Sequence, residues 1–146
     1  MAEMAAAGLA EGIAGAGVRV TPVEAGRMWL VSGVEMPANT VAGGQYWLAP
    51  GRVLVVGGAV PEGALVSEVG DGFVVLDIGG ARWREILAMA GTLPAGALEP
   101  GMCAQTLFAG VRMLIAGRDG GIRVFVERPL SAWLLDWLRQ AATSFV

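Results

Sequence analysis

The stretch from Gly72 to Thr106 constrains the fold most, because its hydrophobic period changes along its length. Residues 73–78 form an apolar, partly β-branched run with one acid, Asp77, which predicts a strand buried on at least one face. The period then becomes helical, which predicts an amphipathic helix of about three turns with an apolar face of Trp83, Ile86, Leu87 and Ala90. Gly91 ends this helix, and after a loop the chain returns to a strand at residues 102–108.

Further strands are predicted on both sides of this stretch. Residues 18–31 contain two apolar runs separated by a turn at Glu24-Ala25-Gly26. Residues 46–56 predict a hairpin that turns at Ala49-Pro50-Gly51, and Arg118-Asp119-Gly120-Gly121 predicts another hairpin. The chain is therefore rich in strands before and after its central helix.

A second amphipathic helix is predicted near the end of the chain. It begins at Ser131, which is expected to be its N-cap, and its apolar face contains Leu134, Trp137, Leu138, Ala141 and Phe145. This order of strands and helices predicts an α+β fold, an antiparallel sheet with packed helices. We expect a single domain over residues 18–146, preceded by a flexible or short helical N-terminus at residues 1–17.

The residue inventory excludes several classes of function. The chain has no histidine, and all ten of its basic residues are arginine. A histidine-dependent catalytic triad and a lysine Schiff base are therefore excluded. The net charge of −3, without a basic run, argues against nucleic-acid binding, and no apolar run is long enough to cross a membrane. The single cysteine precludes an intramolecular disulfide and is typical of a reducing compartment, so we expect a cytoplasmic protein.

Cys103, Gln105 and Thr106 are the candidates for a ligand pocket, because they follow a loop on one short strand. A cysteine without a neighbouring base more often behaves as a small buried hydrophobe, and Gln105 and Thr106 more often form hydrogen bonds between strands. The sequence has neither a dinucleotide fingerprint nor a phosphate-binding loop with its lysine. We therefore expect no catalytic residue and no metal site in this chain.

Other polar side chains are expected to have structural roles. Asp77 lies near the end of a buried strand, so it needs a partner, and Arg82 or Arg84 at the start of the following helix are the expected ones. Asn39 and Thr40 follow a proline-containing loop and are expected to cap a turn.

The composition also predicts a surface that a partner covers, and the alternative is that the abundant alanine and glycine raise the apolar count without forming such a surface. Hydrophobic residues make up 55% of the chain and charged residues only 16%. Trp133 and Trp137 lie in the terminal helix, and core packing readily explains only one of two tryptophans in one helix. These two tryptophans, together with Asn39 and Thr40, are the candidate partner-interface residues.

Four segments carry a resemblance to a known family. Residues 38–57, 74–91, 99–106 and 128–145 occur in the order and approximate spacing of the gamma subunit of heterotetrameric sarcosine oxidase, which the chain resembles over roughly its last three quarters. The most specific pieces are Asn39-Thr40, Trp47-Leu48, and the Pro-Gly-x-Cys-Ala-Gln-Thr segment followed by a Trp-rich terminal helix.

The resemblance implies a fold similar to the folate-binding domain of the glycine-cleavage T-protein. It implies a non-catalytic gamma subunit that supports the alpha subunit of a bacterial complex in the oxidative demethylation of sarcosine or a related secondary amine. The other partners are then the beta and delta subunits. FAD, FMN, NAD and tetrahydrofolate are expected in the partner subunits, not in this chain.

Two alternatives remain open at this point. One is a stand-alone folate or one-carbon-binding protein whose ligand lies beside Cys103 to Thr106. The other is a homodimeric scaffold without an enzymatic role, in which the terminal helix packs against its copy. The isolated chain is not expected to be catalytic under any of these hypotheses.

Overall fold

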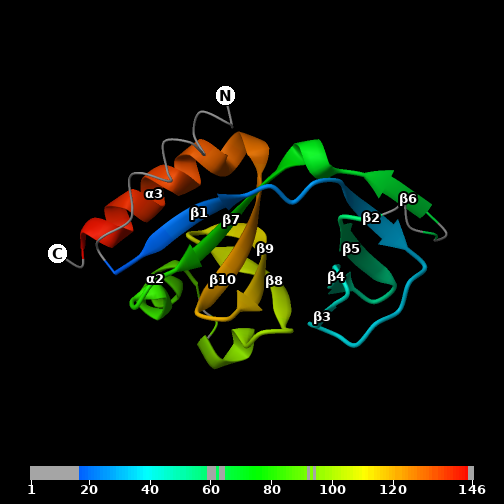
Figure 1. The fold of residues 1–146 in the computed structure, drawn as a ribbon, viewed down its shortest axis with the longest axis horizontal. Helices are drawn as coiled ribbons and strands as arrows, with labels where there is room; N and C mark the ends of the chain where they lie inside the picture. Colours follow the sequence, from blue (N-terminus) through cyan, green and yellow to red (C-terminus); the bar gives the residue numbers. More distant parts are fainter. Residues whose placement is uncertain (1–16, 59–61, 63–64, 92, 94, 145–146) are drawn as a thin grey trace.

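The computed structural model describes residues 17–58, 62, 65–91, 93 and 95–144, which form two five-stranded sheets and two helices (Figure 1). Sheet A contains, in spatial order, β1 (Arg19–Val23), β7 (Phe73–Gly79), β10 (Gly121–Glu127), β9 (Val111–Arg118) and β8 (Cys103–Phe108). Sheet B contains β3 (Val41–Ala42), β4 (Gln45–Ala49), β5 (Arg52–Val56), β2 (Met28–Ser32) and β6 (Leu65–Glu68). Neighbouring strands are antiparallel in both sheets.

The two α-helices lie on one face of sheet A. Helix α2 (Trp83–Ala90) buries the four apolar residues expected from its spacing, and helix α3 (Ser131–Thr143) runs along the sheet beside β1 (Figure 1). Three short 3-10 segments connect the elements: η1 (Gly70–Gly72), η2 (Ala95–Leu98) and η3 (Arg128–Leu130). The α+β class expected from the sequence is therefore confirmed.

Side chains of sheet A alternate between two cores, as the pleat of a strand requires. In β7, Val74, Leu76 and Ile78 pack under the helices. Val75, one position away, packs with Phe125 in the space between the two sheets. A third, smaller cluster covers the outer face of sheet B, where Trp29, Val31 and Val53 are buried. The molecule thus has three layers: helices, sheet A and sheet B.

The sequence predicts one antiparallel sheet, but the strands form two. The sequence pattern does not separate the strands of sheet B from those of sheet A. Strands β1 and β2 follow each other in the chain, but β1 pairs with β7 in sheet A whereas β2 pairs with β5 and β6 in sheet B. The hairpins β4–β5 and β9–β10 form at the turns expected from the sequence. The sequence therefore predicts the turns between neighbouring strands, but it does not predict which distant strands pair.

Ser131 does not act as the N-cap of α3. Residue Leu130 holds that position, and no side chain caps the helix there. Ser131 is already helical and buried, and its hydroxyl donates a hydrogen bond of 2.7 Å to the carbonyl oxygen of Arg128. The reason is η3, which begins the helical path of the chain three residues earlier and makes Ser131 an interior position.

The N-terminal segment expected at residues 1–17 lies outside the described residues except for Gly17. Phe145, expected on the buried face of α3, also lies outside them. None of the described helices combines the length and apolar character needed to span a bilayer.

Candidate functional site

Cys103 lies between the two sheets, where it is 1% exposed. Its Sγ atom is 3.4 Å from the carbonyl oxygens of both Thr40 and Trp47. Burial raises the pKa of the thiol from 9.0 to about 11, because the thiolate would lose its hydration there. The thiol is therefore protonated at neutral pH and acts as a packing group, as expected from the absence of a base.

The raised pKa of Cys103 predicts a loss of stability at alkaline pH. Between pH 9 and about 11 the unfolded thiol loses its proton while the folded thiol keeps it, so rising pH favours the unfolded state. We expect this group to lower the free energy of unfolding by about 2 kcal/mol at pH 10.5 relative to pH 8. Urea titrations of the wild type and of Cys103→Ala at both pH values measure this change in the free energy of unfolding. An equal pH dependence in the two proteins would contradict the assignment.

The three candidate pocket residues do not converge on one site. Cys103 packs in the core between the sheets, whereas Ala104 and Phe108 of the same strand pack under the helices. By strand alternation Gln105 shares the face of Cys103, and Thr106 shares the opposite face. Gln105 lines a groove between the sheets, and the residues of that groove do not include Thr106.

Asn39 and Thr40 join the two sheets. The Thr40 hydroxyl donates to the carbonyl oxygen of Pro37 at 2.6 Å, which confirms its expected role in a turn. The backbone N–H of Cys103 donates to the carbonyl oxygen of Asn39 at 2.9 Å, and Thr40 forms a β-bridge with Met102. Both residues therefore connect the long loop of sheet B to the first residues of β8.

The two tryptophans of α3 have different environments. The ring of Trp137 is half-buried and meets the ring of Phe108 edge-on, with centroids 5.9 Å apart. Trp133, one turn earlier, is 42% exposed. Trp137 thus belongs to the core under the helices, and Trp133 is the tryptophan available to a partner.

The expected partners of Asp77 are wrong. Arg123, which faces Asp77 on the neighbouring strand, donates to both carboxylate oxygens at 2.8 and 3.0 Å, and Arg118 also pairs with Asp77. Arg82 instead pairs with Glu85 at 3.0 Å, and the guanidinium of Arg84 lies 4.6 Å from the centre of the Trp83 ring. Cross-strand register, which the sequence pattern does not reveal, decides the pairing.

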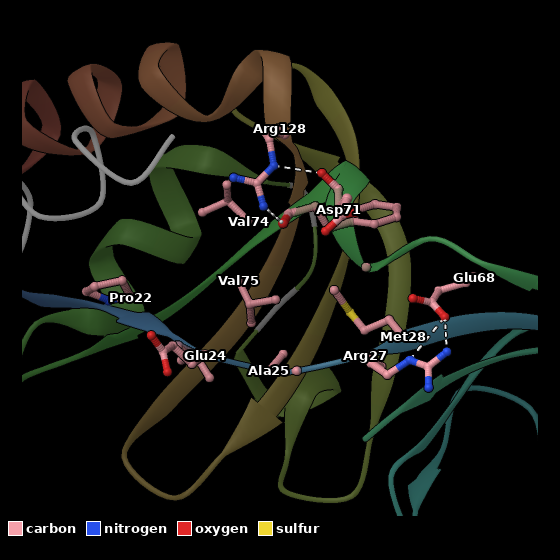
Figure 2. Close-up of a pocket in the computed structure, with 14 residues that line it drawn as sticks. Pro22, Glu24, Ala25, Arg27, Met28, Glu68, Asp71, Val74, Val75 and Arg128 are labelled. Atoms are coloured by element: carbon pink, nitrogen blue, oxygen red, sulfur yellow. Dashed lines mark hydrogen bonds and ion pairs between the residues drawn. The ribbon is translucent and has the colours of Figure 1, made fainter. Parts of the chain in front are cut away.

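A groove of about 610 Å3 lies where the chain passes between the two sheets, lined by residues 22–28, by parts of 68–75 and by Arg128 (Figure 2). Arg27 pairs with Glu68 at one side of it, which lowers the pKa of the Glu68 carboxyl. At the other side Arg128 donates to the carbonyl oxygens of Asp71 and Phe73, at 2.7 and 3.1 Å. The cationic groups of this groove are thus engaged within the protein, and they hold the crossing segments in place.

A second groove, of about 410 Å3, opens between the inner faces of the sheets. Its apolar part includes Leu54, Leu114 and Phe125, and its polar part includes Arg52, Gln105, Arg112 and Glu127. Among the residues that the structure describes, no group of three or more His, Cys, Asp or Glu side chains is arranged to hold a metal ion. This second groove is the candidate ligand site.

No family model matches the chain, and no curated protein matches it by sequence. Among solved structures it superposes on a chain of the heterotetrameric sarcosine oxidase from Corynebacterium sp. U-96, determined in complex with pyrrole 2-carboxylate. The TM-score is 0.79, and the match covers 99% of this chain and 94% of that chain. The chain has the fold of a sarcosine oxidase subunit. The sequences are 16% identical, so the likeness to sarcosine oxidase is one of fold, and it confirms at that level the resemblance seen in the sequence.

Proposed function

We propose that this chain is a non-catalytic subunit of a heteromeric sarcosine oxidase or of a related secondary-amine oxidase, in the role of the gamma subunit. The observation that carries the proposal is the fold match to a chain of such an oxidase, which extends over nearly the whole of both chains. A match of this extent includes both sheets and both helices, so it involves the arrangement of the entire domain rather than one common motif.

The reactive groups of the described residues support a structural role. The thiol of Cys103 is buried and protonated, and the carboxylate of Asp77 is neutralised by two arginines. The sequence offers no histidine and no lysine in their place. In the proposed complex FAD, FMN, NAD and tetrahydrofolate belong to the alpha subunit and its beta and delta partners, and the complex operates in the cytoplasm.

Trp133 is the proposed anchor to the partner chain. Its indole is 42% exposed on a helix whose other face is buried against sheet A. Tryptophan is enriched at the energetic centres of protein interfaces, because a large rigid side chain gains much contact area for little loss of side-chain entropy. The proposed docking surface therefore includes the exposed side of α3.

The proposal is tested by purifying the tagged full-length chain from its native cells and assaying the captured material for flavin absorbance and sarcosine-dependent peroxide formation. We expect larger flavin-containing chains to be captured. Recovery of this chain alone, as a monomer or homodimer, would contradict the proposal.

Replacing Trp133 with alanine tests the anchor separately. We expect the affinity for the partner chain to fall by roughly 30-fold, the effect of losing about 2 kcal/mol at an interface hot spot. The thermal stability of the isolated chain should change little, because the side chain is largely exposed. Leu65→Ala, at a 65% exposed position of sheet B, is the matched control and should leave the affinity unchanged. Unchanged binding of Trp133→Ala would exclude α3 as the docking surface.

A further inference from the structure

Two exposed arginines, Arg52 and Arg112, lie at the mouth of the groove between the sheets. In β5, Leu54 packs between the sheets, and Arg52 lies two positions before it. In β9, Leu114 packs between the sheets, and Arg112 lies two positions before it. Because alternate residues of a strand share a face, each arginine lies near the start of its strand on the side of the second groove, and both line that groove.

Protection of a sheet edge does not explain these arginines. Inward-pointing charges commonly protect edge strands from pairing with other chains. Strand β5, however, lies between β4 and β2, and β9 lies between β10 and β8. Each arginine therefore stands on an interior strand that already has two neighbours.

The two arginines also lack the carboxylate partner that Arg118 and Arg123 share. Arg123 is held by both oxygens of Asp77. In contrast, neither Arg52 nor Arg112 forms an ion pair with any described residue, and the only hydrogen bond from their side chains within that part of the chain runs from Arg112 Nε to Gln105 Oε1 at 3.4 Å. Their capacity to bind an anion is therefore largely unused.

We propose that the groove between the sheets binds a small amphipathic monocarboxylate. Its apolar body would lie on the partly exposed side chains of Leu30, Leu48 and Phe73, and its carboxylate would be held by Arg52 and Arg112. A volume of about 410 Å3 is that of a small-molecule site, and a guanidinium group matches the geometry of a carboxylate. Glu127 lines the same groove and repels additional negative charge, which favours a ligand with a single carboxylate.

This binding site is independent of the proposed subunit role, because its residues come from the inner faces of the sheets and not from the exposed side of α3. The chain would then carry a bound organic acid whether or not a partner covers α3. If no partner chain is captured, the groove proposal is unaffected. If the groove binds no carboxylate, the proposed subunit role is unaffected.

The test uses 2-naphthoate and decanoate as carboxylate probes and 2-naphthalenemethanol as a neutral control. Calorimetric titration of the full-length chain should show saturable binding of at least one carboxylate, and the affinity for the neutral probe should be lower by at least about tenfold, as loss of a charge-assisted hydrogen bond requires. Arginine Nε–H resonances followed by NMR should shift for Arg52 and Arg112.

Arg112→Gln is the test variant, and Arg19→Gln is the matched control, because it removes the same charge from an exposed residue that does not line this groove. The first change should weaken carboxylate binding by about tenfold or more and the second should leave it unchanged. Equal binding of the neutral probe, equal effects of both variants, or no saturable binding of either carboxylate would overturn the proposal.

Discussion

Phe125→Ala is expected to lower the free energy of unfolding by about 3–5 kcal/mol, the cost of removing a fully buried aromatic ring. Phe125 is 2% exposed and lies in the core between the two sheets, where the ring of Tyr46 meets it edge-on with centroids 5.0 Å apart. Tyr46 belongs to sheet B and Phe125 to sheet A, so this contact joins the layers. A domain of this kind is stable by only about 5–15 kcal/mol, so a large fraction of its stability would be lost.

Denaturant titration followed by tryptophan fluorescence measures this loss. Leu65→Ala is the matched control, because Leu65 is also a large apolar residue in a strand but is 65% exposed. We expect the control to stay within about 0.5 kcal/mol of the wild type. A change of less than about 1 kcal/mol for Phe125→Ala would mean that the two sheets do not pack on each other through this ring.

Gly117→Ala is expected to cost about 2–3 kcal/mol, through a steric conflict and not through loss of a contact. A Cβ atom at Gly117 would lie 2.1 Å from the carbonyl oxygen of Leu98 and 2.3 Å from that of Glu99. Both atoms belong to the backbone, so no side-chain rotation relieves the conflict. The end of η2 and the residue after it would have to move away from β9, which would expose Leu98, a residue that is 2% exposed in the native fold.

Hydrogen exchange tests this prediction together with denaturant titration. The amides that loosen should include that of Gly117, which donates to the carbonyl oxygen of Met102 at 2.9 Å. Gly72→Ala is the matched control, because a Cβ there meets no atom within 4 Å. Wild-type stability in Gly117→Ala, or equal losses in both variants, would show that residues 98–99 do not lie against β9 in solution.

The local elements of the fold were predictable from the sequence, because each depends on residues close together in the chain. The spacing of Trp83, Ile86, Leu87 and Ala90 predicted the buried face of α2, and Gly91 predicted its end. The Arg118 to Gly121 segment predicted the hairpin of β9 and β10.

The division of the strands into two sheets was not predictable in the same way, because it depends on pairing between distant residues. The pattern of residues 18–31 is that of two strands and a turn, whether the strands join one sheet or two. It does not indicate that the first strand pairs with β7 and the second with β5. The partners of Asp77 were mistaken for the same reason. Arg123 is far from Asp77 in sequence and becomes its neighbour only through the register of β7 and β10.

Some residues of the candidate site were predictable from the sequence. Gln105 was singled out, and the structure places it in the groove between the sheets. Arg52 and Arg112 were missed, although a signal exists: each stands in an alternating run at a position whose next same-face neighbour is leucine. That signal has meaning only once it is known which face of each strand turns toward the other sheet. A strand that is buried on both faces is apolar throughout, so its sequence does not show which face that is.

Sheet B lies entirely between β1 and β7 in the chain, and this insertion affects how the protein folds. Strands β8, β9 and β10 meet through short turns, whereas β1 must wait for the closure of a loop of about 50 residues before it meets β7. Closing such a loop costs entropy before any contact is gained, and topologies with many distant contacts fold slowly. We infer that the β8–β10 meander forms early and that pulse-labelled amides of β1 gain protection late. Strand β1, the first strand among the described residues, would then be among the last to become ordered.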